Sequence, residues 1–132
     1  MNKTLHIGLW VVQALLALAF LGAGFMKLTT PIDELVKAGM TWAQDPLWLA
    51  RFVGAAEFAG GLGLILPAAL RIAPKLTGVA AAALTLVMVL AEVVHVRLGD
   101  GVGQMVPAFV LGALSAFVAW GRLKAAPIAP RG

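Results

Sequence analysis

The apolar positions of the chain fall into four long runs separated by short polar segments. The runs extend from about Ile7 to Met26, Leu47 to Leu66, Leu76 to Val96 and Met105 to Trp120. Each is close to the roughly 20 residues that a helix needs to cross a hydrocarbon core of about 30 Å. Each is apolar on all sides and lacks the strict alternation of a barrel strand. The pattern therefore predicts an all-α fold, a bundle of four transmembrane helices.

A shorter amphipathic segment separates the first two runs. Thr30 and Pro31 precede two acids, which is the order of an N-cap, a proline at the first helical position and a negatively charged first turn. Asp45 and Pro46 give the same signal where the second run begins. The apolar residues between these signals recur on one helical face: Ile32, Leu35, Val36, Gly39 and Met40. We therefore expect a short amphipathic helix in the outer interface, between helices 1 and 2.

Composition agrees with a membrane protein. The 132 residues are 61% hydrophobic and only 12% charged, and the mean hydropathy is +0.96, whereas about a quarter of a soluble domain is charged. The chain has no cysteine, which excludes disulfides, thiolate metal sites and thiol nucleophiles. We expect one transmembrane domain over residues 1–124 and a disordered basic tail over 125–132. The basic residues beside the tail favour contact with anionic lipid rather than with nucleic acid.

The basic residues are distributed unevenly between the two sides of the membrane. Four spans place the N-terminus, the loop 67–75 and the tail together, and that side holds bases and no acid: Lys3, Arg71, Lys75, Arg122, Lys124 and Arg131. The other side mixes both signs: Lys27, Lys37, Arg51 and Arg97 with Asp33, Glu34, Asp45 and Asp100. This asymmetry predicts a bacterial-type cytoplasmic membrane protein with both termini in the cytoplasm.

One carboxylate lies deep inside an apolar run. Glu57 is about 15 Å along the second helix from Leu47, which places it near the middle of the bilayer. Gly54, Gly60 and Gly61 lie beside it and leave room for another helix or a bound group. Ionisable residues at this depth are costly and mark functional sites, but an ion pair that fixes the bundle would explain Glu57 equally well.

A second polar group lies near the outer end of the third run. Glu92 and His95 are three residues apart, so they share a helical face and could contact one ligand. A di-iron centre would need a second Glu-x-x-His pair and two further glutamates, so we predict no metal site. Lys27, Arg51 and Arg97 complete the polar residues of the outer half, and each could instead reach the headgroups.

Three segments together resemble the DoxX-like family of small four-helix membrane proteins, over about residues 5–123. These segments are Phe20–Leu28, Arg51–Pro67 and His95–Asp100. The family takes its name from a membrane subunit of quinone-linked oxidoreductases in sulfur metabolism, and relatives have been tied to redox-defence complexes. The resemblance implies that Lys27, Arg51, Glu57 and His95 match polar positions of the family. Glu92 departs from the pattern, because an apolar residue is usual there.

From the residues and the resemblance we expect an accessory membrane subunit linked to quinone metabolism. Glu57 and His95 would bind a quinone headgroup and relay protons. A redox partner protein would carry the electrons, because the chain alone has no redox centre or complete catalytic constellation. Whether it is an enzyme stays open. Two alternatives remain: a small proton-coupled transporter or lipid-binding bundle that uses Glu57, and a membrane assembly or chaperone subunit without a ligand. Small residues spaced four apart in every span also favour tight packing or a homo-oligomer.

Overall fold

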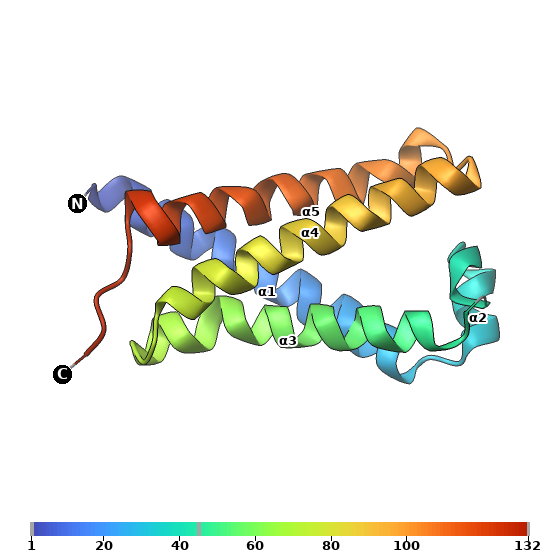
Figure 1. Ribbon diagram of the computed structural model, residues 1–132, viewed down its shortest axis with the longest axis horizontal. Coiled ribbons are helices and arrows are strands. Elements are labelled where there is room, and N and C mark those ends of the chain that lie inside the picture. Colours follow the sequence, from blue (N-terminus) through green and yellow to red (C-terminus); the bar gives the residue numbers. More distant parts are fainter. Residues whose placement is uncertain (1, 45, 132) are drawn as a thin grey trace.

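The computed structural model describes residues 2–44 and 46–131, so Asp45 lies outside the described residues. Helices make up nearly all of these two ranges, and no strand occurs in them (Figure 1). The elements are α1 (Lys3–Thr29), α2 (Ile32–Lys37), the 3₁₀ turn η1 (Thr41–Gln44), α3 (Trp48–Leu70), α4 (Lys75–Leu98), α5 (Val102–Trp120) and the π-helical turn η2 (Gly121–Ala125). Four of them are long and apolar enough to cross a membrane. The predicted all-α bundle, with a short helix between its first two spans, is confirmed.

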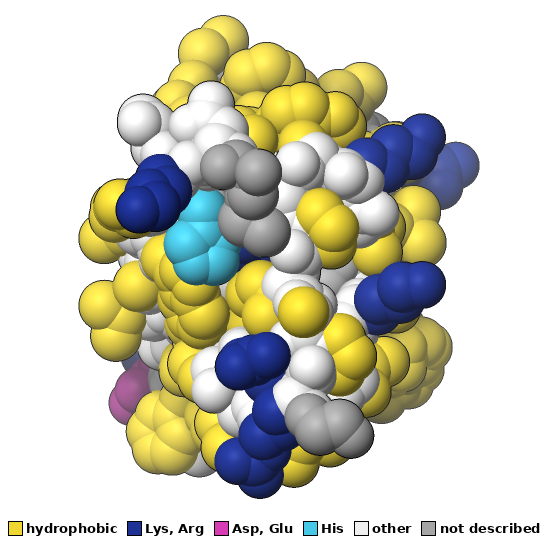
Figure 2. Space-filling model, turned by 90° about the vertical axis from the view of Figure 1, so that its left-hand side faces the viewer, with side chains coloured by type: hydrophobic (Ala, Val, Ile, Leu, Met, Phe, Trp, Pro, Cys, Tyr) yellow, Lys and Arg dark blue, Asp and Glu magenta, His cyan; other side chains and the backbone are white. Residues whose placement is uncertain are grey.

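The two ends of the bundle differ in how the helices are arranged. Both termini and the turn between α3 and α4 lie at one end, which we name the terminal end, and α2 lies at the other, the α2 end (Figure 1). Toward the α2 end, α1 with α3 and α4 with α5 form two pairs that diverge (Figure 1). At the terminal end the pairs are joined, since Gly121 lies against the Leu9 side chain of α1, and Gly63 of α3 lies against the Ala80 side chain of α4. Lys and Arg side chains surround this face (Figure 2).

The apolar residues divide into a packed interior and a lipid-facing surface. One continuous core runs between the four long helices and includes Leu16, Phe20, Leu64 and Leu84. Many large apolar side chains are exposed on the outside, and Leu18 retains 72% of its accessible surface. Lipid is the solvent that makes such exposure favourable. The chain is therefore a multi-pass membrane protein.

A proline inside α3 is accommodated by α4. Pro67 has no N–H, so it leaves the carbonyl of Gly63 without its helical donor. The hydroxyl of Thr77 donates to that carbonyl oxygen at 2.9 Å. A freed carbonyl in a membrane needs a partner inside the protein, and this bond fixes the start of α4 against the end of α3.

The short helix α2 begins and ends at other residues than the sequence predicted. Thr30 closes α1, because its N–H donates to the carbonyl of Met26 at 2.9 Å, and it does not cap α2. The helix ends at Lys37 and the chain reverses at Gly39, whose φ is +104°, so Gly39 and Met40 lie beyond the helix. The assignment of Thr30 as an N-cap was wrong. Leu35 is nevertheless buried with Ala43 and Ala50, which holds α2 and η1 against the start of α3.

Candidate functional site

A buried ion pair joins α1 and α3 toward the α2 end. Lys27 Nζ donates to Glu57 Oε1 at 2.7 Å, and the two side chains are 12% and 3% exposed. Burying either charge alone in a membrane is costly, and the partner offsets part of that cost. Lys27 therefore turns into the bundle, and our interpretation that it reaches the headgroups was wrong.

Two glycines explain why these charges meet. A Cβ placed on Gly24 would lie 2.6 Å from the carbonyl oxygen of Gly54 and 2.6 Å from the amide nitrogen of Phe58. A Cβ placed on Gly54 would lie 2.8 Å from the Cβ of Lys27. Only residues without a side chain permit this approach, in which the backbones of α1 and α3 touch. The crossing brings Lys27 within hydrogen-bond distance of Glu57.

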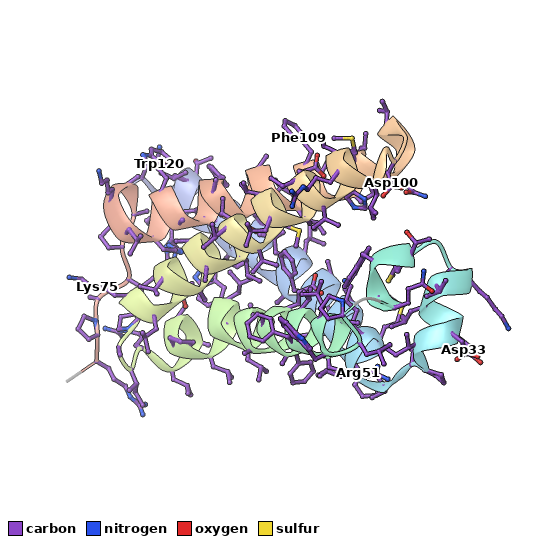
Figure 3. All side chains as sticks on the ribbon, turned by 45° about the vertical axis from the view of Figure 1, so that its right-hand side comes forward. Asp33, Arg51, Lys75, Asp100, Phe109 and Trp120 are labelled. Carbon is purple, nitrogen blue, oxygen red and sulfur yellow. The ribbon has the colours of Figure 1, made fainter. Side chains whose placement is uncertain are left out.

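Arg51 holds the end of α1 in place. Its Nη1 donates to the carbonyl oxygens of Lys27 at 2.8 Å and of Thr30 at 2.7 Å. The last carbonyls of a helix lack intrahelical donors and carry partial negative charge, so a guanidinium there is doubly favourable. Figure 3 shows Arg51 on α3 near this end. Arg51 thus positions Lys27 through its backbone carbonyl. The Arg51 side chain is bonded within the protein and does not extend unpaired toward the headgroups.

A separate polar group closes the turn between α4 and α5. His95 Nδ1 lies 2.7 Å from Asp100 Oδ2, and each side chain is 19% exposed. Gln104, with its amide nitrogen turned toward Asp100, donates to the same carboxylate at 3.0 and 3.1 Å. Asp100 lies at the tip of this helix pair, apart from Arg51 on α3 (Figure 3). The group stabilises the turn and fixes the orientation of the His95 ring.

The remaining predicted residues lie along α4. One carboxylate oxygen of Glu92, Oε1, is shielded from solvent and has no hydrogen-bond partner among the described residues. Arg97 is exposed at the end of the helix. Glu92 makes no hydrogen bond to His95, which bonds to Asp100 instead. Glu57 and His95 also belong to different helix pairs, so the structure divides the predicted site into two groups. Within residues 2–44 and 46–131 there is no group of three or more His, Asp or Glu that could hold a metal ion.

The family comparison covers all of these positions. The family model described as DoxX-like matches residues 11–118 of the chain. The chain belongs to the DoxX-like family. Comparison with curated proteins and with solved structures gave no match. The membership expected from the motifs is thus confirmed, and the matched range includes every predicted site residue: Lys27, Arg51, Glu57, Glu92, His95 and Arg97.

This DoxX-like bundle has a further polar cluster, at the terminal end, that the sequence analysis missed. Arg122 is only 2% exposed. Its Nε donates to Gln13 Oε1 at 2.6 Å, and its Nη1 donates to the carbonyl of Ala126 at 2.9 Å and lies 3.0 Å from His6 Nδ1. Gln13 in turn donates to the carbonyl of Leu64 at 2.7 Å. An amide inside an otherwise apolar first span was the signal that could have revealed this cluster.

Proposed function

We propose that this DoxX-like protein is an accessory membrane subunit in quinone-linked redox metabolism, and that the Lys27–Glu57 pair receives the quinone headgroup. The observation that carries the proposal is an ammonium and a carboxylate paired at 2.7 Å inside a membrane bundle, toward the end where the helix pairs diverge. Quinones dissolve in the bilayer, so a site for their headgroup has to lie among lipid-facing helices. A charge pair at this depth is a candidate functional site by default.

The two side chains offer complementary chemistry. Lys27 has three N–H donors, and Glu57 Oε1 engages one of them, so the others can donate to a quinone carbonyl. The Glu57 carboxylate can accept a hydrogen bond from a quinol hydroxyl and take up its proton. His95, held by Asp100, is in this proposal a second proton-handling group at the same end rather than a direct partner of Glu57. A partner protein carries the electrons: it accepts them when a quinol that gives its proton to Glu57 is oxidised, and it supplies them when a quinone is reduced. The uneven distribution of basic residues supports cytoplasmic termini.

Binding of a short-chain quinone to the purified protein in nanodiscs tests the proposal. Glu57→Gln keeps the size of the side chain and removes its charge, so we expect quinone affinity to fall on the order of tenfold, the value of one charge-assisted hydrogen bond. Glu34→Gln is the matched control, because it makes the same change on an exposed residue of α2. Equal affinity of wild type and both variants would refute a quinone site at Glu57.

The alternatives predict different results in the same preparation. A proton-coupled transporter would show pH-driven uptake in liposomes that Glu57→Ala abolishes. An assembly subunit would bind no quinone and show no such uptake, and it would retain a partner protein when purified from native membranes. Either pattern would replace the quinone proposal.

A further inference from the structure

The terminal end contains a pocket that none of the proposed quinone chemistry uses. Its volume is about 390 Å³, within the range of roughly 300–1,000 Å³ that is usual for small-molecule sites. Most of its wall is apolar, with one histidine and one arginine as the titratable members. The lining residues come from α1, from the end of α3 and from the C-terminal tail: His6, Trp10, Ala68, Ala69, Arg71, Ile128 and Ala129.

The tail forms one wall of this pocket because Arg71 holds it. Arg71 Nε donates to the carbonyl of Ala129 at 2.9 Å, and the N–H of Arg131 donates to the carbonyl of Arg71 at 3.0 Å. A guanidinium has five N–H donors. The tail engages Nε and Nη2, and Nη1 makes no hydrogen bond to the described residues. Arg71 therefore shapes the pocket and keeps donors for an occupant.

Next to the pocket lies a buried cation, Arg122, that has no anionic partner among the described residues. The guanidinium of Arg122 sits 5.6 Å from the ring centroid of Trp10 and contacts His6, and both of these residues line the pocket. Its hydrogen-bond partners among the described residues are all uncharged groups, including the amide of Gln13. A buried charge that lacks a counter-charge is costly in a membrane protein. An anion in the adjacent pocket would supply the missing negative charge.

The contact between Arg122 and His6 determines which nitrogen of the His6 ring can donate a hydrogen bond to a ligand. Because a guanidinium only donates, its contact with His6 makes Nδ1 the acceptor and leaves the ring proton on Nε2. His6 therefore has an N–H donor in addition to the atom that Arg122 engages. Together with Arg71 Nη1, it gives the pocket two donors suited to anionic oxygens.

We propose that this pocket binds the phosphate of an anionic membrane phospholipid. The phosphate oxygens bind Arg71 and His6 and compensate the charge of Arg122, and the glycerol and upper acyl chain lie along Trp10, Ala69 and Ile128. The apolar walls and the tryptophan, a residue typical of the membrane interface, favour a lipid over free phosphate. Basic side chains surround this face (Figure 2) and attract anionic lipid to it.

Native mass spectrometry of the full-length protein, released from micelles that contain phosphatidylglycerol or phosphatidylcholine, tests this. We expect retention of phosphatidylglycerol and not of phosphatidylcholine, and a loss of affinity on the order of tenfold for Arg71→Gln. Lys75→Gln removes the same charge from the same end outside the pocket, and we expect it to change affinity by about twofold or less. Equal losses in both variants would mean diffuse surface attraction and would overturn the site.

Two further experiments test whether the bound phosphate belongs to a lipid or is free phosphate, and whether the lipid occupies this pocket. Millimolar inorganic phosphate should leave the retained lipid in place, and displacement of the lipid would identify a free-phosphate site instead. Ala69→Trp fills the pocket without changing charge, so it should abolish retention, and unchanged retention would refute the pocket as the binding place. Because Arg71 is far from the Lys27–Glu57 pair, Arg71→Gln should leave quinone affinity unchanged, whichever way the quinone proposal itself turns out.

Discussion

A methyl group on Gly24 would have to occupy space that the backbone of α3 already fills. The Cβ would lie 2.6 Å from the Gly54 carbonyl oxygen and 2.6 Å from the Phe58 amide nitrogen, whereas unstrained contacts of carbon are about 3.5 Å or longer. Both neighbours are backbone atoms, so no rotation of a side chain can relieve the overlap. Gly24→Ala must therefore push α1 and α3 about 1 Å apart at their crossing.

Gly22 provides the control for this substitution. It lies on the same helix, and a Cβ there meets nothing within 4 Å. Replacing a helical glycine with alanine gains up to about 1 kcal/mol in intrinsic helix propensity, and this gain cancels when the two variants are compared. Overpacking costs about 1–3 kcal/mol. We therefore expect Gly24→Ala to be about 1–3 kcal/mol less stable than Gly22→Ala.

The displacement should also reach the candidate site. Lengthening the Lys27–Glu57 contact of 2.7 Å by about 1 Å takes it past the upper limit of a hydrogen bond, about 3.2 Å, so quinone binding should weaken in Gly24→Ala and not in Gly22→Ala. Unfolding by sodium dodecyl sulfate in mixed micelles, followed by circular dichroism, measures the stability of both variants. Equal free energies of unfolding for the two would refute the close crossing and, with it, our explanation of the ion pair.

Two other predictions use the same unfolding assay. Glu57→Leu leaves the Lys27 ammonium buried without its partner and should cost about 3–5 kcal/mol, and combining it with Lys27→Met should recover most of that loss; a double variant as unstable as the single one would contradict this. Thr77→Val removes the donor to the carbonyl that Pro67 frees and should cost about 0.5–2 kcal/mol. Thr85→Val is its control, since the Thr85 hydroxyl donates to the carbonyl of Ala81 within its own helix, and an equal loss there would contradict our account.

The four spans were predictable because the membrane leaves the chain few choices. A long apolar run must satisfy its backbone internally, so it forms a helix wherever it lies. The ends were less predictable: α1 extends from Lys3 to Thr29, beyond the apolar run, because helices continue through the interface where hydropathy changes. Thr30, Pro31 and the two acids after them form the usual pattern of a helix start, yet Thr30 is the residue that closes α1. Its carbonyl accepts from Arg51, a contact with α3 that no local pattern encodes.

The candidate site was half predictable for a related reason. The depth of Glu57 follows from counting residues, but its partner is 30 residues away along the chain. Whether Lys27 faces the headgroups or the bundle depends on the rotation of α1 against α3, which the contact between Gly24 and Gly54 sets. From the sequence, Arg122 was only counted among the basic residues on the side of the termini. The π-helical turn η2 and the packing of Gly121 against Leu9 turn it inward.

The buried cation near the α2 end is paired with a carboxylate, whereas the buried cation at the terminal end is bonded to neutral groups. This difference determines which ligands each end can bind. Lys27 has a carboxylate partner, so the Lys27–Glu57 pair itself has no net charge, which matches an uncharged quinone headgroup. Arg122 bonds only to neutral groups among the described residues, so the terminal end keeps its positive charge and favours an anion. Salt screens attraction between opposite charges but acts little on neutral partners. Raising the ionic strength should therefore weaken phospholipid retention and leave quinone affinity unchanged, which makes the two proposals separable in one preparation.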